Sequence, residues 1–377
     1  MKPLAILISY HHPSSGRKAG FHFIADGLRK RGWRVLFVTT SFSWINRLKS
    51  SDHRPALAPW GTTNRIHHLD VDLDGFVWEP PIHPISLRKT WLDRLARPFF
   101  ERAARRFPEK LIPAAREAKM VVFESCAGLS LAPRLQQLNP KAVFVYRVSD
   151  DLPGMGAPEI LCDLERRALP QMSWMSTPCE AIRARLEREG ANKARLSVDL
   201  HGVDFQSLKD LPGSANPYQT QNNAVFVGIS LLDQAWLARA ARLAPHWNFH
   251  IVGPFEQKVN LPNVFYTGLL PFHETLPYIR FAQYGLHTLI SHPALATYTD
   301  TLKIQQYSFC NLPTLAPSDL IAPHRPFFLY ERDNDESIRG ALERAEKAHG
   351  TLQTSHLIGS WEQVIDRLVA PVQAQTS

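Results

Sequence analysis

The chain has little of what marks several common classes of protein. Its four cysteines are widely scattered and form no CxxC pair, so the sequence predicts neither a zinc site nor a disulfide framework. No window approaches about 18 uninterrupted apolar residues, so no transmembrane helix is expected. Residues 1–10 contain only a short apolar run without a small-residue cleavage site, which favours a buried first strand over a signal peptide.

Signatures of nucleotide and nucleic-acid binding are also missing. No GxGxxG follows the first strand of either half and no GxxxxGK(S/T) occurs, which argues against dinucleotide binding and against a P-loop enzyme. No zinc-finger, RNP-type or other recognition motif points to a nucleic-acid partner. Residues 70–75 (DVDLDG) imitate the start of a calcium loop, but the twelfth position, which needs a bidentate Glu, is Pro81. We therefore interpret 70–75 as a polar-alternating edge strand.

Acidic residues are scarce in the first third of the chain. Residues 1–110 hold 19 Lys and Arg against 9 Asp and Glu, whereas residues 111–377 hold 24 against 26. The whole positive excess of a chain with net charge +8 therefore lies near the N-terminus. Such an asymmetry predicts a polyanionic partner for this part: an anionic lipid, a phosphate-bearing substrate or a nucleic acid.

Apolar strands alternate with helical segments throughout the chain. In the first half, strands are expected at 4–9, 33–40, 120–124, 142–147 and 174–177. After residue 200 the pattern restarts, with short strands that each end in glycine at 224–228, 249–253 and 264–268. Continuous apolar strands separated by helices predict parallel sheets covered on both faces, and therefore an α/β fold.

The doubled pattern predicts two Rossmann-like domains. We expect an N-terminal domain at 1–203 and a C-terminal domain at 204–357, whose first part (204–223) is linker-like and rich in Pro, Ser, Asn and Gln. Residues 358–377 are expected to hold a last helix, about 360–370, that stops before Pro371; its return to the N-terminal domain is left open. Because ligands of open parallel sheets bind beyond the carboxyl ends of the strands, the expected site is a cleft between two facing sheets.

Two acidic segments follow predicted strands of the first half. Asp150 and Asp151 come just past 142–147, where a carboxylate facing the cleft can take the proton of an attacking hydroxyl as a general base. The alternative is that Asp150 caps the next helix. Glu124 ends the strand 120–124, and both a structural hydrogen bond and a contact with substrate are open for it.

The segment 298–307 (YTDTLKIQQY) combines a helix start with a lysine. If Thr299 or Asp300 caps this helix, Lys303 lies in the first turn and Gln306 lies one turn later on the same face. Backbone N–H groups at a helix start, together with a lysine, suit a diphosphate. The alternative is an ordinary lysine that faces solvent.

Residues 88–119 form a basic segment with 10 basic and 4 acidic residues. Apolar residues recur there at every fourth position, in a stripe that winds slowly around a helix: Trp91, Leu95, Phe99, Ala103, Phe107 and Leu111. Such a segment can lie on an anionic membrane surface, although it must be broken or kinked by Pro98, Pro108 and Pro113. The alternative is a helix pair packed on the core with a solvated basic face.

Five short stretches resemble one family in the same order along both domains. They are HFIADGL (22–28), VVFES (121–125), VYRVSDDL (145–152), HGVD (201–204) and LKIQQYSFCNLP (302–313). On these stretches the chain resembles the xanthan-type GumK family of glucuronosyltransferases, and the resemblance covers most of the chain. It implies a GT-B fold, in which two Rossmann-like domains face each other across a cleft, and an inverting transfer of glucuronate from UDP-glucuronate.

The resemblance also implies partners and residue roles. The acceptor is expected to be a polyprenyl-diphosphate-linked oligosaccharide of exopolysaccharide synthesis, and the protein is expected to bind peripherally to the cytoplasmic face of the inner membrane. Asp150 is the expected general base. Donor contacts are expected from Lys303, Gln306, Ser230, Thr301 and Asp300, and acceptor or cleft contacts from Glu124, Ser125 and His22. From the basic segment 88–119, and not from the resemblance, the expected membrane contacts are Trp91, Phe99, Phe107, Arg94 and Arg102.

No metal or other cofactor is expected, because no DxD motif lies at a strand end facing the cleft; Lys303 and a helix N-terminus can neutralise a departing diphosphate. The chain departs from the family pattern in the length of 287–298, where Tyr298 is the only candidate for the family's donor-side tyrosine. Asp300 and Thr301 stand at positions where the family has small hydroxyl residues. A related donor, such as UDP-glucose or a UDP-hexosamine, therefore stays open.

Three other functions compete with this interpretation. A retaining GT-B transferase commonly carries two Glu eight residues apart near the donor, and residues 285–313 contain no Glu. A sugar-nucleotide epimerase can share the fold, but it does not need a basic amphipathic first domain. A non-catalytic, membrane-bound partner of a polysaccharide assembly complex does not need both Asp150 and Lys303.

Overall fold

Eight strands form the first sheet in the computed structural model, which describes residues 2–16, 18–40, 42–44, 63–84 and 90–376. Their order is β3-β4-β2-β1-β5-β6-β7-β8, and all neighbours are parallel except β3 and β4. The central strands are buried along their whole length, as continuous apolar strands covered on both faces should be. The strands are β1 (Leu4–Ser9), β2 (Arg34–Thr39), β3 (Ile66–Asp70), β4 (Leu73–Val77), β5 (Met120–Phe123), β6 (Val143–Arg147), β7 (Trp174–Thr177) and β8 (Leu196–Val198).

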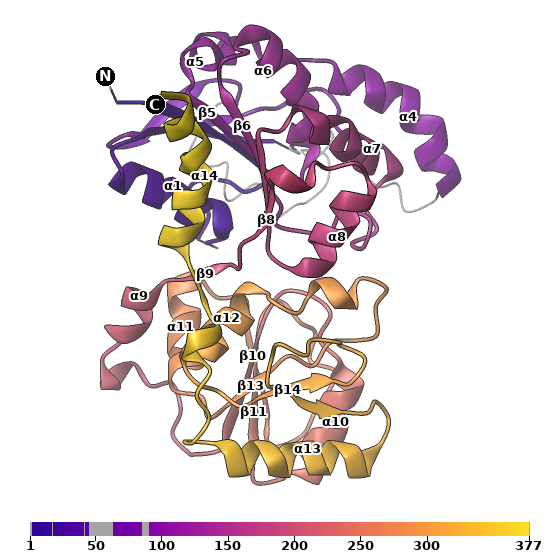
Figure 1. Ribbon diagram of the computed structural model, residues 1–377. Helices are drawn as coiled ribbons and strands as arrows, with labels where there is room; N and C mark the ends of the chain where they lie inside the picture. The colour runs from indigo at the N-terminus through magenta and orange to yellow at the C-terminus, as the bar shows by residue number, and fades with distance from the viewer. Residues whose placement is uncertain (1, 17, 41, 45–62, 85–89, 377) are drawn as a thin grey trace. The chain divides into compact units, whose positions relative to one another are not determined.

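This sheet and its helices form the first compact unit, residues 1–199 and 361–377. The α-helices described in it are α1 (Gly20–Lys30), α4 (Thr90–Ala104), α5 (Ile112–Glu117), α6 (Ala132–Leu138), α7 (Glu159–Ala168), α8 (Glu180–Arg188) and α14 (Trp361–Thr376). The last helix, α14, lies beside α1 and also contacts β6 and β7 (Figure 1). Gly27 permits the close approach of α1 to α14, because a Cβ atom there would lie 2.0 Å from Ile365 Cδ1.

The second unit, residues 200–360, is built on a six-stranded parallel sheet in the order β12-β11-β10-β13-β14-β15. Its strands are β10 (Asn223–Val227), β11 (Asn248–Val252), β12 (Val264–Gly268), β13 (Tyr284–Leu286), β14 (Thr314–Pro317) and β15 (Phe328–Tyr330). The α-helices are α9 (Phe205–Lys209), α10 (Gln234–Leu243), α11 (Phe272–Arg280), α12 (Leu302–Phe309) and α13 (Asp335–Ala348). A small parallel pair joins β9 (Gly202–Val203) to β16 (Gly359–Ser360).

The limits of the two units differ by a few residues from the predicted domain limits, at both places where the chain passes from one unit to the other. The chain leaves the first unit after Asp199, because β9 already pairs with β16 inside the second unit. The stretch predicted to be linker-like, 204–223, is part of the second unit. It contains α9, and Leu208 of this helix is fully buried in a small cluster with Val203 and Leu276.

Two local predictions are wrong. The last helix does not stop before Pro371 but continues through it to Thr376. Burial of Ile365 and Leu368 stabilises this helix on the first unit, which offsets the hydrogen bond that the proline cannot donate. Residues 70–75 are not a single edge strand: Asp70 ends β3, Val71 and Asp72 form the turn of the β3–β4 hairpin, and the remaining three residues belong to β4. Asp72 has a φ of 59°.

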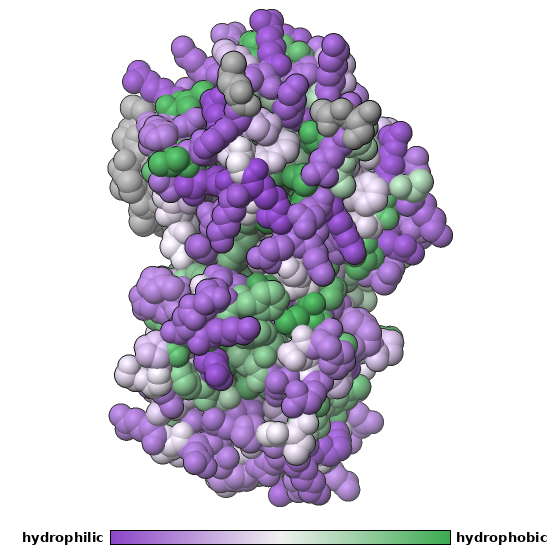
Figure 2. Space-filling view, turned by 60° about the vertical axis from the view of Figure 1, so that its left-hand side comes forward, coloured by the Kyte–Doolittle hydropathy of each residue, from purple (hydrophilic) through white to green (hydrophobic). Residues whose placement is uncertain are grey.

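Each unit has its own hydrophobic core. The core of the first contains β-strand residues such as Ile6, Val121 and Phe144, and the core of the second contains Phe226 and Trp247. Hydrophilic side chains cover most of the face of the molecule drawn in Figure 2, where hydrophobic ones appear in small groups. Within the described ranges, no helix has both the length and the apolar character that crossing a membrane requires.

Candidate active site

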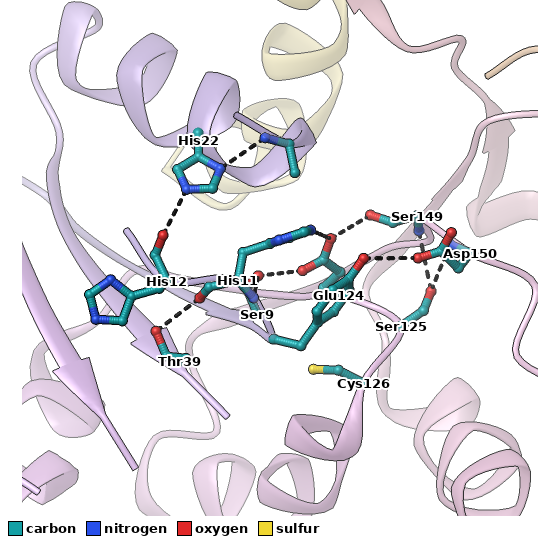
Figure 3. A network of polar contacts seen from close by, with 12 residues as sticks. Ser9, His11, His12, His22, Thr39, Glu124, Ser125, Cys126, Ser149 and Asp150 are labelled. Carbon is teal, nitrogen blue, oxygen red and sulfur yellow. Dashed lines mark hydrogen bonds and ion pairs between the residues drawn. The ribbon is translucent and has the colours of Figure 1, made fainter. Parts of the chain in front are cut away.

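Three neighbouring strands of the first sheet end at one cluster of polar side chains (Figure 3). Strands β1, β5 and β6 are adjacent and parallel, so their carboxyl ends meet at one edge of the sheet. The residues that follow these strands in the cluster are Tyr10, His11, Glu124, Ser125, Ser149 and Asp150. The structure thus brings together the predicted residues Glu124, Ser125 and Asp150. It adds three neighbours that were not predicted: Tyr10, His11 and Ser149.

Glu124 is the buried centre of this cluster. One of its oxygens accepts a hydrogen bond from the Ser9 hydroxyl, and the other accepts one from Ser149 Oγ at 2.8 Å. His11 Nε2 lies 3.8 Å from Glu124 Oε1. Burial raises the pKa of Glu124 to about 7, although the two serine bonds favour the charged form. Glu124 therefore holds a proton part of the time at neutral pH.

Asp150 is half-buried, and its two carboxylate oxygens have different surroundings. Oδ2 accepts a hydrogen bond from the Tyr10 hydroxyl at 3.2 Å, whereas Oδ1 bonds to no residue in the described ranges. Burial and then the charge of Glu124 raise the pKa of Asp150 to about 6. The helix-cap alternative is wrong, because α7 begins at Glu159 with Pro158 as its N-cap. A carboxylate with an open oxygen and a pKa near neutrality has the properties of a general base.

The next residue, Asp151, is engaged in a structural ion pair. Its carboxylate lies 2.6 Å from the guanidinium of Arg185, which also pairs with Glu165 at 2.7 Å and with Glu189 at 2.8 Å. Because Arg185 already holds the Asp151 carboxylate, Asp150 is the member of the pair that remains open to a substrate.

Ser125 holds the backbone of the segment that carries Asp150. Its Oγ accepts hydrogen bonds from the N–H groups of Ser149 and Asp150, at 3.2 and 3.4 Å. The hydroxyl of Tyr146, 3.1 Å from Ser125 Oγ, is itself hydrogen-bonded to Glu165. Since Tyr146 has a single proton to donate and gives it to Glu165, the Ser125 hydroxyl donates to Tyr146. Ser125 is therefore a structural support rather than an open substrate contact.

His22 also has a structural position. Its Nδ1 accepts a hydrogen bond from the N–H of Ala19 at 3.0 Å, at the start of α1. Its Nε2 lies 2.9 Å from the carbonyl oxygen of His12 and must therefore carry the proton of the neutral ring. Burial lowers the pKa of His22, in agreement with this neutral form. Both ring nitrogens are thus occupied by backbone groups, which leaves the predicted contact with substrate without a free polar atom.

In the second unit, Lys303 lies at the carboxyl ends of β10 and β13. It stands in the first turn of α12, and its Nζ lies 3.6 Å from the centre of the Phe226 ring. A Cβ atom on Gly228, just past β10, would lie 3.8 Å from this Nζ. No carboxylate of the described ranges forms an ion pair with the ammonium, and burial lowers the pKa of Lys303 to about 7. The alternative of an ordinary solvent-facing lysine is therefore wrong.

The histidine beside Lys303 adds no second positive charge. His287 follows β13, and burial and then the charge of Lys303 lower its pKa well below the usual range, so the ring is neutral. His287 Nε2 lies 2.9 Å from the Tyr298 carbonyl oxygen. The Thr301 hydroxyl, at the N-cap of α12, is buried without a hydrogen-bond partner in the described part of the chain. An unpaired cation and an unsatisfied donor at a helix start together favour an anionic ligand.

The other predicted donor residues differ in their surroundings. Gln306 is buried one turn after Lys303, and its amide bonds to no residue in the described ranges. Ser230 is exposed beyond the end of β10. Asp300 is buried and binds Arg325, the ring of His324 at 2.8 Å and the Thr299 hydroxyl at 2.7 Å. Asp300 therefore anchors the start of α12 rather than capping it, since the N-cap is Thr301.

Only part of the predicted membrane stripe is exposed. Trp91, Leu95 and Phe99 on α4 are exposed by 59, 66 and 69 %, and Arg94 and Arg102 are exposed beside them. Phe107 lies beyond the end of α4 and packs against the core of the first unit, so its assignment to the membrane stripe is wrong. Ala103 and Leu111 are buried as well. The stripe leaves the surface because α4 ends at Ala104, while Pro98 is accommodated inside it.

Three residues of the first cluster, Tyr10, His11 and Ser149, were missed in the sequence. The signal that could have identified Tyr10 and His11 is their position directly after the first strand, since the carboxyl end of a central parallel strand belongs to the ligand-binding edge.

Within the described ranges, no three His, Cys, Asp or Glu residues are grouped as a metal site would need.

Comparisons with known proteins identify relatives of this chain. The family model "Glucuronosyltransferase GumK, N-terminal domain" matches residues 7–178, which include the whole polar cluster of the first unit. UDP-glucuronate:glycolipid 2-beta-glucuronosyltransferase of Xanthomonas campestris pv. campestris is 28% identical over 376 residues, covering 98% of this chain and 90% of the relative.

Solved structures show the same fold at low sequence identity. Sucrose-phosphate synthase of Thermosynechococcus elongatus is 13% identical with a TM-score of 0.69, and the match covers 100% of this chain and 99% of that one. Anabaena HepE in complex with UDP and glucose is 13% identical with a TM-score of 0.62, covering 99% and 98%. These likenesses identify the fold as GT-B. The matching family model and the full-length relative show that the chain belongs to the GumK family of glucuronosyltransferases.

Proposed function

We propose that this protein transfers glucuronate from UDP-glucuronate to a hydroxyl of a glycolipid acceptor, with inversion at the anomeric carbon. The name of the Xanthomonas relative specifies this donor and a glycolipid acceptor. The same name specifies a β-linkage, which inversion produces from an α-linked UDP-sugar. The acceptor that we propose is an oligosaccharide on a polyprenyl diphosphate, as used in exopolysaccharide synthesis.

The observation that carries the donor side of the proposal is the unpaired ammonium of Lys303. A cation removed from water without a counter-ion is unfavourable, and its lowered pKa expresses that cost. A diphosphate supplies the missing negative charge, and the N–H groups at the start of α12 add donors to it. Thr301 and Gln306 offer further polar groups beside Lys303. We therefore assign residues 204–357 to donor binding, with Ser230 as an outer contact.

The observation on the acceptor side is the open oxygen of Asp150. In the proposed reaction, Asp150 takes the proton of the acceptor hydroxyl while the hydroxyl oxygen forms a bond to the anomeric carbon. The bond from that carbon to the diphosphate oxygen breaks, and UDP leaves with both electrons of this bond. Lys303 stabilises the negative charge that develops on the leaving group. No metal ion takes part in this scheme.

The lipid end of the acceptor gives a purpose to the exposed stripe on α4. Trp91, Leu95 and Phe99 present apolar surface, and Arg94 and Arg102 beside them attract anionic headgroups. We propose that the first unit binds peripherally to the cytoplasmic face of the inner membrane through this helix. The enzyme would then meet its acceptor without removing the lipid tail from the bilayer.

A panel of UDP-sugars tests the proposal. The protein is incubated with UDP-glucuronate, UDP-glucose and UDP-N-acetylglucosamine, and both the release of UDP and the shift in Tm are measured. We expect UDP-glucuronate to be hydrolysed fastest and to raise the Tm most. A clear preference for UDP-glucose would contradict the proposed donor but not the proposed type of reaction. No response to any UDP-sugar would contradict the enzymatic function.

A further inference from the structure

The hydrogen bond between Tyr10 and Asp150 assigns Tyr10 a part in the reaction. We infer that Tyr10 is a positioning residue, whose hydroxyl holds Oδ2 of Asp150 so that Oδ1 is presented to the acceptor hydroxyl. This inference rests on the proposed function, in which Asp150 is the general base. Tyr10 itself forms no bond to the reacting atoms in this scheme.

Two contacts are needed to orient Asp150 because its side chain has two rotatable bonds. Ser125 Oγ fixes only the backbone, through the N–H groups of Ser149 and Asp150. The carboxylate is still free to rotate about χ1 and χ2 unless a further group holds one oxygen. Tyr10 is the described residue that does so, and misplacement of a base by about 1 Å is enough to slow proton transfer strongly.

The position of Tyr10 is itself determined by the end of β1. Its ring lies against the ring of His11, with centroids 4.0 Å apart and the two planes tilted by 35°. The backbone N–H of His11 donates to Ser9 Oγ at 2.9 Å, and the Ser9 hydroxyl in turn donates to Glu124. Burial and then the charge of Asp150 raise the pKa of Tyr10 well above its usual value, so the phenol stays protonated and remains a donor.

The groups around Asp150 affect its titration in opposite directions. The hydrogen bond from Tyr10, at the end of β1, lowers the pKa of Asp150 because it stabilises the carboxylate. The negative charges of Glu124, at the end of β5, and of the adjacent Asp151 raise it. Loss of the Tyr10 hydroxyl must therefore move the acidic limb of the rate profile to higher pH, whereas loss of a neighbouring negative charge moves it to lower pH.

The test is the pH dependence of kcat for the full-length Tyr10→Phe variant, measured with UDP-glucuronate and a glycolipid acceptor. A hydrogen bond to a charged group corresponds to roughly one pH unit, so we expect the acidic limb to move up by about one unit and kcat at pH 6, near the pKa of Asp150, to fall about fivefold. The KM for UDP-glucuronate should stay unchanged.

Matched controls separate this effect from a general loss of a tyrosine hydroxyl. Tyr218→Phe removes a hydroxyl that donates to the Tyr278 carbonyl oxygen at 2.7 Å in the second unit, and it should leave the profile in place. Calorimetry with UDP and the Tm show whether Tyr10→Phe is folded. If it is not, Tyr10→His, which keeps a ring donor, replaces it and should hold the limb closer to that of the wild type than Tyr10→Ala does.

The outcome that overturns the inference is an acidic limb of Tyr10→Phe that coincides with that of the wild type. Failure of the proposed function looks different: Asp150→Asn would then keep its turnover, whatever Tyr10→Phe does. A dead Asp150→Asn variant together with an unshifted Tyr10→Phe limb rejects the role of Tyr10 alone.

Discussion

Neighbouring carboxylates have different roles in this protein because their partners differ. Asp151 is held by Arg185, Glu124 is enclosed by hydroxyl groups, and Asp150 keeps one oxygen open. All three have a raised pKa, mainly through burial. The open oxygen, rather than the size of the pKa shift, therefore distinguishes the proposed base from its neighbours.

Replacing the two adjacent aspartates should separate catalysis from stability. Asp150→Asn is expected to lower kcat by about 10² to 10⁴, the usual contribution of a general base, while the affinity for UDP stays the same. Asp151→Asn should keep most of the turnover but lower the Tm, because it leaves Arg185 with one partner fewer. Steady-state rates and thermal melts of both variants check this; near-normal turnover in Asp150→Asn would refute the assignment of the base.

Binding of UDP should take up protons because of Lys303. The pKa of Lys303 is lowered to about 7, so the free protein loses this positive charge as the pH rises through 7. A bound diphosphate stabilises the charged form and raises the pKa again. We expect proton uptake to be close to zero at pH 6 and to approach one proton per UDP at pH 8, with weaker affinity at the higher pH.

Calorimetry in buffers of different ionisation enthalpy measures this uptake. Lys303→Met should weaken binding of UDP itself and remove the proton uptake, because Met fills similar space without a charge. The matched control is Lys258→Met, which makes the same change at an exposed lysine. Equal uptake in wild type and Lys303→Met would assign the proton to another group.

Among the helices, α4 carries a sequence repeat of which only some members are exposed on the surface. The four-residue repeat continues from Trp91 to Leu111, but the helix carrying it ends at Ala104. Beyond that point the repeat has no geometric meaning, and Phe107 and Leu111 contribute to the core instead. The three exposed members, Trp91, Leu95 and Phe99, are therefore the ones that can reach a membrane.

Replacing these three residues together by Ser should release the protein from anionic vesicles while UDP binding stays intact. The apolar contribution to vesicle binding disappears, and what remains depends on arginine charge, about 1 kcal/mol for each, which salt screens. Co-sedimentation with anionic and neutral vesicles at low and high salt measures both contributions. Wild type should be only partly released by high salt, and the triple variant completely.

Phe107→Ser is the matched control for this experiment. It should lower the Tm without changing vesicle binding per folded molecule, because Phe107 packs against the core. If the triple variant of α4 unfolds, or if it sediments as wild type does, the exposed stripe is not the membrane contact.

The contact between α1 and α14 leads to a prediction about stability. Gly27→Ala places a Cβ atom 2.0 Å from Ile365 Cδ1, so the helices must separate or Ile365 must change rotamer. Overpacking of this kind costs typically about 1–3 kcal/mol. We expect a lower Tm for Gly27→Ala and partial recovery in the double variant with Ile365→Val, measured by thermal melts. Additive losses in the double variant would show that the two residues do not share this space.

At the scale of the whole molecule, the chemistry is expected to need no metal ion. Lys303 and the start of α12 supply positive charge for the leaving diphosphate, which a divalent cation supplies in other transferases. Activity should therefore be unchanged after dialysis against EDTA and in the presence of excess EDTA. An absolute requirement for Mg²⁺ or Mn²⁺ in a rate measurement would contradict this prediction.

The α/β class, the doubling and the family could be predicted from the sequence because they depend on local patterns. Apolar runs such as 4–9 and 142–147 specify buried parallel strands whatever surrounds them. The predicted limits of the two halves erred by a few residues, because β9 and β16 pair across more than 150 residues of chain. A pairing so distant leaves no local signal in the residues that make it.

What the sequence determined by itself is which residue types follow each strand: the carboxyl ends of β5 and β6 carry Glu124 and Asp150, and the start of α12 carries Lys303. Which of these groups are open depends on contacts that form in the folded chain. The tertiary structure engages His22 with two backbone groups and Asp300 with Arg325, and it leaves Lys303 without a described counter-ion. It also places Tyr10 against Asp150, 140 positions apart in sequence. The physical reason is that hydrogen-bond partners and burial, which set the availability and pKa of each group, come from strands and helices distant in the chain.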